Sequence, residues 1–208
     1  MYIPEHFRMP DEDVEAFLSS VGGGNLITVD EGRPHATFLP WVVSEGSLIS
    51  HMGTVNPQSR HTGEGLVVFM GDDAYISDEW MEGVTAPTWD YETIHVYGQY
   101  RVHTDPFWIL DSLSSLLKRF SNRALVDYDP DWVEIQTRSV VGVEVAITEI
   151  HAKSKLSQNR TEPEAHSIID HLTETCPHLA SRISDVSLPH ICARDERTRE
   201  IRSHVRLS

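Results

Sequence analysis

The chain has 208 residues, of which 39% are hydrophobic, so it suits one well-buried domain with an appendage rather than two full domains. Its formal net charge of -15 argues against direct nucleic-acid binding, because long-range attraction to polyanions supplies most non-specific DNA affinity. No apolar run approaches the roughly 20 residues that span a bilayer, and the N-terminus lacks a basic start followed by an apolar stretch. We therefore expect a cytoplasmic protein without a membrane segment.

The charge is distributed unevenly along the chain, and the cysteine and histidine patterns argue against a disulfide and a metal site. Residues 1–150 hold 8 Lys and Arg against 24 Asp and Glu, whereas residues 151–208 hold 9 against 8. Cys176 and Cys192 lie outside any CxxC pattern, so we expect free thiols rather than a disulfide. The 12 histidines form neither HExxH nor a short-spaced pair, and no metal site is expected.

The first half of the chain predicts one helix followed by short strands. The helix begins near Asp11, has acids in its first turn and ends at three glycines. Pro40 cannot donate to a strand ladder, so it predicts an edge or a bulge, and residues 71–73 predict a turn. The predicted strands are residues 25–29, 34–43, 48–52, 65–70, 74–77 and 91–103. Short strands joined by Gly and Asp turns favour a closed or half-closed antiparallel barrel.

The longest of these strands, residues 91–103, has two usable faces. Its alternation places Glu92, Ile94, Val96 and Gly98 on one side and Tyr91, Thr93, His95, Tyr97 and Gln99 on the other. Such a strand suits a barrel wall that presents one face to a ligand or to a partner subunit. Two ordinarily packed faces explain this stretch alone equally well.

The second half predicts helices, a late strand and a basic segment. Asp105-Pro106 and Asp129-Pro130 each begin a helix, the first with an apolar stripe, and residues 139–148 alternate as a strand. Residues 150–160 are basic, and either bind an anion such as phosphate or form a solvated loop. Two further helical stretches are expected at residues 168–176 and 193–202, of which the second has mixed charge and is expected to be solvated, a C-terminal arm for a partner being the alternative. The arginines of the second make it a weaker candidate for a nucleic-acid contact.

Several motifs, taken in order, resemble the PaiB family. They are Met1 to Phe7, Phe38-Leu39-Pro40, His51 with Asn56-Pro57-Gln58, Asp73 to Ser77, Pro87 to Tyr91 with His95 and Gly98, and Lys155 to Arg160. The resemblance covers residues 1–160, which we expect to form the barrel domain, with residues 161–208 as a helical C-terminal extension.

The resemblance implies a mainly β protein with flanking helices, an antiparallel split β-barrel of the FMN-binding type. It also implies a homodimer that binds FMN near its interface and regulates gene expression. The cofactor-binding residues that it implies are Leu39, Pro40, His51, Asn56, Gln58, Trp89, Tyr91, His95, Lys155, Ser157, Gln158 and Asn159. An apolar and aromatic wall with a few polar groups suits the flat flavin ring.

The chain departs from the family pattern at positions that face the ligand. It has Thr37-Phe38 where the family usually has Asn-His, and Thr54 where an arginine is common. Its loop of residues 80–86 contains Glu82 and no Lys or Arg. Because a phosphate dianion prefers cationic donors, we expect weaker FMN binding or a different ligand, with Lys155 as the main remaining cation.

Three classes of function are compatible with these observations. The chain is a flavin-binding regulator, a flavin-dependent oxidoreductase or small-molecule handler, or a family member that has lost flavin binding. No Ser-His-Asp, Cys-His or paired-carboxylate spacing is recognisable, so any catalysis would be that of the cofactor, and no catalytic residue is assigned.

Overall fold

The computed structural model describes residues 1–83 and 85–205, and the chain divides into two compact units that we describe separately. Unit 1 comprises residues 1–14, 70–93 and the chain from 152 onward, and unit 2 comprises residues 15–69 and 94–151. The residues beyond 160, expected as a helical extension, cluster with residues 1–14 and 70–93. Val84 of the acidic loop and Arg206 of the arginine-rich stretch lie outside the described residues.

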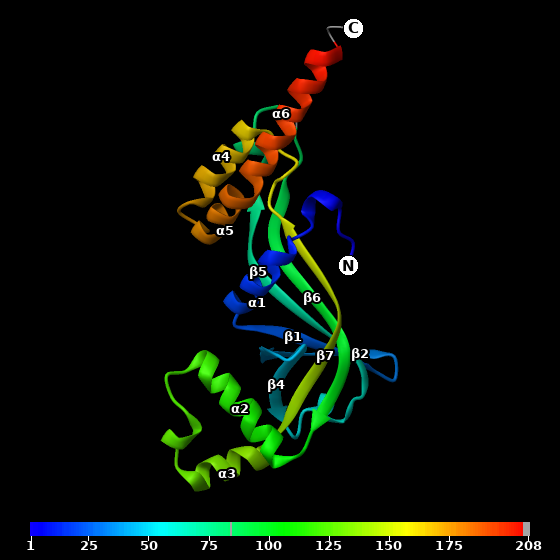
Figure 1. Ribbon diagram of the computed structural model, residues 1–208, viewed down its shortest axis with the longest axis vertical. Coiled ribbons are helices and arrows are strands. Elements are labelled where there is room, and N and C mark those ends of the chain that lie inside the picture. Colours follow the sequence, from blue (N-terminus) through cyan, green and yellow to red (C-terminus); the bar gives the residue numbers. More distant parts are fainter. Residues whose placement is uncertain (84, 206–208) are drawn as a thin grey trace. The chain divides into compact units, whose positions relative to one another are not determined.

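The strands form one seven-stranded sheet with the order β2-β1-β5-β6-β7-β4-β3 (Figure 1). Their bounds are β1 Gly23–Asp30, β2 Arg33–Pro40, β3 Val42–Ser44, β4 Ser47–Gly53, β5 Gly63–Ile76, β6 Thr88–His103 and β7 Val140–Lys155. The registered pairs β1–β2, β1–β5, β3–β4 and β4–β7 are all antiparallel. The antiparallel barrel class expected from the sequence is confirmed.

The short link between β2 and β3 shows why the sheet of unit 2 curls. These two strands are the opposite edges of the sheet, yet only Trp41 separates them in the chain. Since successive Cα atoms are 3.80 Å apart, the two edges must meet at this point. The buried Trp41 donates from Nε1 to the Gly24 carbonyl at 3.1 Å, and Ser50 donates to the Pro40 carbonyl at 2.6 Å. The interruption predicted at Pro40 is therefore the corner of the barrel.

The two faces predicted for β6 are present. Glu92, Ile94, Val96, Gly98 and Tyr100 are buried, whereas Tyr91, His95 and Tyr97 are half-buried and Gln99 is exposed. Thr93, expected on the second face, is an exception, because it is buried as well. Gly98 has a steric role, because a Cβ at this position would lie 2.2 Å from the Ala146 carbonyl oxygen on β7. Any larger residue would push β6 and β7 apart.

Two predicted interruptions of the strands are wrong. The turn expected at residues 71–73 is part of the continuous strand β5, in which Asp72 and Asp73 are exposed. The turn was expected because Gly and Asp are common in turns. An Asp is also tolerated in a strand when its side chain points to solvent, as it does here. Similarly, β7 continues through Lys155, so most of the basic segment, for which a solvated loop was one of the two alternatives, is strand.

In unit 2, two helices follow β6, and a third element precedes β1. They are α2 Pro106–Phe120, α3 Pro130–Ser139 and the end of α1 Asp11–Ser20, with short 3-10 turns at η2 Pro57–Arg60 and η4 Leu125–Asp127. Asp105 and Asp129 cap α2 and α3 by accepting backbone N–H bonds, as the sequence predicted. Arg119 of α2 donates to the carbonyls of Trp41, Leu18 and Val21, which fixes this helix to the barrel corner.

The helices of unit 1 pack on a core of their own. They are α4 Glu162–Leu172, α5 Pro177–Arg182, a π-helical turn η5 Ile183–Ser187 and α6 Leu188–Val205, together with η1 Glu5–Phe7 and η3 Asp78–Trp80. Ile168, Leu172, Leu179 and Ile183 bury their side chains with Ile76 and Leu156. The joint predicted at Leu188-Pro189 is not an interruption, because the chain is helical from α5 through η5 into α6. No helix within the described residues combines the length and apolarity required to cross a membrane.

Candidate functional site

Lys155, the cation predicted to bind a phosphate, is bound within unit 1. Its ammonium lies 3.2 Å from Asp90 Oδ1, donates to Thr88 Oγ1 at 2.7 Å and donates to the Trp89 carbonyl. Burial raises the pKa of the enclosed Asp90 carboxyl, while a hydrogen bond from Ser157 and the charge of Lys155 lower it. A lysine has three N–H donors, and all three are taken here. Lys155 therefore neutralises a buried acid.

The turn after β7 is also held from inside unit 1. Ser157 has a left-handed backbone with φ 65°, and its hydroxyl donates to Asp90 Oδ2 at 2.5 Å. A serine in this region is strained unless its surroundings fix it, and the buried hydrogen bond does so. The Gln158 amide donates to the Ser154 carbonyl at 2.6 Å. Of the implied ligand residues in this turn, Asn159 alone is exposed.

The aromatic residues at the start of β6 differ in exposure. Trp89 is 52% exposed and meets the half-exposed Tyr75 with ring centroids 6.1 Å apart. Tyr91 accepts a hydrogen bond from Lys153 Nζ at 2.9 Å, and the same ammonium lies over the Phe7 ring. Trp89 thus presents an apolar surface to a ligand, whereas the hydroxyl of Tyr91 already has a donor.

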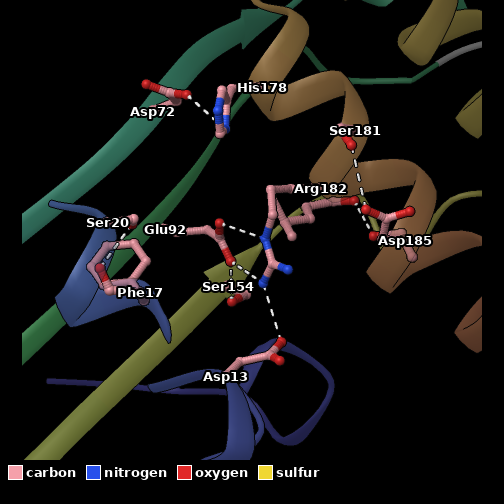
Figure 2. Close-up of polar contacts among 12 residues, drawn as sticks. Asp13, Phe17, Ser20, Asp72, Glu92, Ser154, His178, Ser181, Arg182 and Asp185 are labelled. Atoms are coloured by element: carbon pink, nitrogen blue, oxygen red, sulfur yellow. Dashed lines mark hydrogen bonds and ion pairs between the residues drawn. The ribbon is translucent and has the colours of Figure 1, made fainter. Parts of the chain in front are cut away.

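A second acid of unit 1 is buried on β6, and Figure 2 shows the group of side chains around it. Glu92 accepts from Arg182 Nε and Nη2, both at 3.0 Å, and from Ser154 Oγ at 2.7 Å. Arg182 also donates to Asp13 at 3.1 Å. The hydrogen bonds from Arg182 to Glu92 raise the pKa of the guanidinium, because they favour its charged form. This arginine joins the C-terminal helices to β6.

In unit 2, Gln58 and Asn56 belong to a hydrogen-bond network inside the protein rather than to an open site. The Gln58 side chain is 1% exposed, accepts from Thr37 and donates to Thr28 Oγ1 at 2.9 Å. Asn56 caps η2 and donates to Thr37 at 3.0 Å. Tyr100 donates to the Gln58 carbonyl, and burial raises the pKa of Tyr100 to about 12. Thr37, which departs from the family pattern, is therefore a member of this network.

The other residues of unit 2 that the resemblance implies as cofactor-binding are Leu39 and Pro40 at the end of β2 and the histidines His51 and His95. Leu39 is buried in the core, while its neighbour Phe38 is 67% exposed. His51 and His95 each bury a ring Nδ1 that has no hydrogen-bond partner among the described residues. Burial lowers the pKa of both histidines, which favours the neutral imidazole. A buried, unpartnered nitrogen is costly, so both are positions where a ligand atom would be stabilising.

The cofactor-binding residues that the resemblance implies are divided between the two units. Leu39, Pro40, His51, Asn56, Gln58 and His95 lie in unit 2, and Trp89, Tyr91, Lys155, Ser157, Gln158 and Asn159 lie in unit 1. Sequence reasoning missed Asp90 and Arg182. The alternation of β6 contained a signal for them, because an acid on the same side as Ile94 requires a cation when it is buried.

The cation that sequence reasoning overlooked in unit 2 is Arg60. It is exposed in the last turn of η2, and among the side chains that the structure describes it has neither an ion-pair nor a hydrogen-bond partner. Thr54, where the resemblance makes an arginine common, is exposed on the preceding loop, and its carbonyl accepts a hydrogen bond from Ser59 at 3.2 Å. A phosphate could therefore recruit Arg60 without breaking an existing contact.

Comparison with known proteins agrees with this architecture. Residues 1–149 match the family model described as "Putative FMN-binding domain". The chain is 31% identical over 186 residues to "Protease synthase and sporulation protein PAI 2" of Bacillus subtilis, covering 83% of this chain and 89% of the relative. An uncharacterised Saccharomyces cerevisiae protein is 35% identical over 148 residues, covering 56% of this chain and 88% of that protein.

Two solved structures share the fold. A conserved hypothetical protein from Mycobacterium tuberculosis superimposes with a TM-score of 0.59 at 14% identity, covering 78% of this chain and 95% of that one. A FAD and heme binding protein from Mycobacterium smegmatis gives a TM-score of 0.56 at 16% identity, covering 73% and 74%. The family match supports FMN as the cofactor. The chain belongs to the FMN-binding-domain family of PaiB.

Proposed function

We propose that this protein is an FMN-binding homodimer of the cytoplasm that regulates gene expression, as the resemblance to PaiB implies. The observation that carries the proposal is the family match over residues 1–149, which encloses the barrel of unit 2. Bound FMN would supply one- or two-electron redox chemistry.

The residues of unit 2 fit a flavin in two respects. His95 presents a buried Nδ1 with no partner among the described residues, which suits a hydrogen bond to the edge of the ring. Arg60 is a cation whose donors are unengaged among the described side chains, which suits the phosphate. We assign the phosphate to Arg60 rather than to Lys155, because every N–H of Lys155 already has an acceptor. Trp89, Tyr91 and Asn159 of unit 1 stay candidates for ring contacts.

FMN affinity is expected to depend on cations in the loop that contains Thr54 and Arg60. One charge-assisted hydrogen bond contributes about 1.5 to 3 kcal/mol, so Thr54→Arg should tighten FMN binding by roughly tenfold to a hundredfold. Arg60→Ala should weaken it by a similar factor. Flavin fluorescence quenching measures both constants.

The control for net charge is Thr173→Arg, which adds the same charge at an exposed position at the end of α4 in unit 1. This variant should bind FMN as the wild type does. Nanomolar binding by the wild type that neither loop variant alters would show that the phosphate lies elsewhere.

Sedimentation of the purified protein should give a homodimer, with a mass twice the 23.6 kDa of the chain. The barrel of unit 2 supports this proposal, because Phe38 and Val43 on its edge strands β2 and β3 are 67% and 48% exposed, and Val29 on β1 is 60% exposed. Large apolar side chains that remain in water favour association between copies. A monomer at micromolar concentration would contradict it.

The regulatory role is expected to require a partner other than DNA. A net charge of -15 opposes the release of counterions that drives DNA binding, so the pure protein should bind DNA weakly at physiological salt. An electrophoretic mobility assay tests this, and tight sequence-specific binding would refute it. Rapid oxidation of NAD(P)H by the FMN-loaded protein would instead favour the oxidoreductase alternative.

A further inference from the structure

We propose that unit 2 contains a second small-molecule site in the cavity that α2, α3, β4 and β7 enclose around His51. The proposal assigns His51, which the family resemblance implied as a flavin contact, to a ligand other than the flavin. This ligand would be a small, neutral aromatic molecule with one polar group, and the polar group would form a hydrogen bond with His51 Nδ1. The proposal does not depend on flavin binding.

The cavity has the size and lining that such a molecule requires. Its volume is about 180 Å³, and its wall includes Leu113 and Leu117 of α2 and Tyr128, Trp132 and Gln136 near or in α3. Apolar cavities of about 150 Å³ admit benzene. Tyr128 and Trp132 stack with ring centroids 5.0 Å apart, and Trp132 is 46% exposed, so an aromatic rim of the cavity is in contact with solvent.

His51 provides the polar contact. Its Nδ1 is buried and has no partner among the described residues, so the free protein leaves a hydrogen-bonding group unsatisfied at this position. Across the β4–β7 pair His51 lies opposite Gly142, against which the ring of Trp108 packs, so no side chain from that partner residue satisfies the imidazole. A ligand atom would restore the missing bond.

The charge of the cavity indicates a neutral ligand. Every residue that lines it is uncharged, and burial lowers the pKa of His51, so no cation is present to stabilise an anion. The neighbouring cavity of about 550 Å³ differs, because Glu134 and Arg138 line it. The smaller cavity should therefore bind a phenol in preference to a benzoate of the same size.

Three matched probes test the proposal by ¹⁹F nuclear magnetic resonance: 4-fluorophenol, 4-fluorotoluene and 4-fluorobenzoate. The wild type should bind the phenol and the toluene saturably and the benzoate at least tenfold more weakly than the phenol. His51→Phe keeps an aromatic side chain and removes both ring nitrogens, so the ratio of phenol affinity to toluene affinity should fall about five- to tenfold. His51→Gln restores a polar group and should recover part of that ratio.

Two leucines of α2 give a matched pair of controls. Leu113→Phe fills the cavity and should weaken the phenol and the toluene at least tenfold, whereas Leu110→Phe adds the same volume to the larger cavity and should leave both unchanged. Saturation with FMN should also leave both affinities unchanged. The proposal is overturned if the wild type binds no probe saturably, if benzoate equals phenol, if Leu113→Phe has no effect, or if FMN displaces the phenol.

Discussion

Replacing Arg182 with methionine is expected to lower the free energy of unfolding by about 3–5 kcal/mol, because it leaves the Glu92 carboxylate buried without its cation. The Glu92 side chain is 7% exposed and that of Arg182 is 31% exposed, so water can replace little of the lost interaction. Two N–H bonds at 3.0 Å and the contact with Asp13 disappear together. Urea denaturation of the full chain, followed by circular dichroism, measures the loss.

Two further variants separate the charge effect from the loss of a side chain. Arg197→Met makes the same change at an exposed position of α6 and should shift stability by less than about 0.5 kcal/mol. Glu92→Gln combined with Arg182→Met removes the buried charge but retains an acceptor for Ser154, so it should recover most of the loss. A double variant no more stable than Arg182→Met would mean that the packing of α5, and not the ion pair, carries the effect.

The sequence was sufficient for the fold where local patterns coincide with tertiary structure. The alternation of β6 predicted its buried and half-buried faces except at the buried Thr93, and Pro40, predicted to mark an edge or a bulge, ends the edge strand β2. The turn at residues 71–73 failed because Gly and Asp also occur in exposed strand, and only the neighbouring strands decide between the two. Tertiary pairing is not encoded in a window of three residues.

The candidate site was less predictable, because a residue type does not reveal which partner occupies it. Gln58 and Ser157 have ligand-like chemistry, yet each forms buried bonds within the protein. Arg60 was missed for the opposite reason, since only the structure shows that its donors are unengaged among the described side chains. A buried acid such as Glu92 indicates that a cation is required, but no local signal shows that Arg182, far along the chain, supplies it.

The second large effect is expected at Lys155, in unit 1. Lys155→Met should lower the free energy of unfolding at pH 7 by about 3–5 kcal/mol, because the fully buried Asp90 keeps only its hydrogen bond from Ser157 and the weaker effect of the Arg160 charge. Burial already raises the pKa of Asp90, and loss of the cation raises it further. A carboxyl with a raised folded-state pKa is stabilising when protonated, and that stability is lost as the pH rises through this pKa. The penalty of the variant should therefore shrink on acidification, as Asp90 becomes protonated in both proteins. Below the raised pKa of the wild-type carboxyl, only the loss of the bonds to Thr88 and Trp89 should remain.

Lys153→Met is the matched control, since Lys153 lies two residues earlier on β7 and bonds to the neutral hydroxyl of Tyr91 rather than to an acid. This variant should lose about 1 kcal/mol of unfolding free energy, the contribution of one ordinary hydrogen bond, with no dependence on pH between 4 and 7.

The combination of Asp90→Asn with Lys155→Met should restore stability at pH 7, because the amide oxygen still accepts from Ser157 and bears no charge. Urea denaturation of each variant at pH 7 and pH 4.5, compared with the wild type at the same pH, gives the difference. If Lys155→Met and Lys153→Met lose equal stability, or if the loss at Lys155 is the same at both pH values, then Lys155 does not neutralise Asp90, and its ammonium becomes available again for a phosphate.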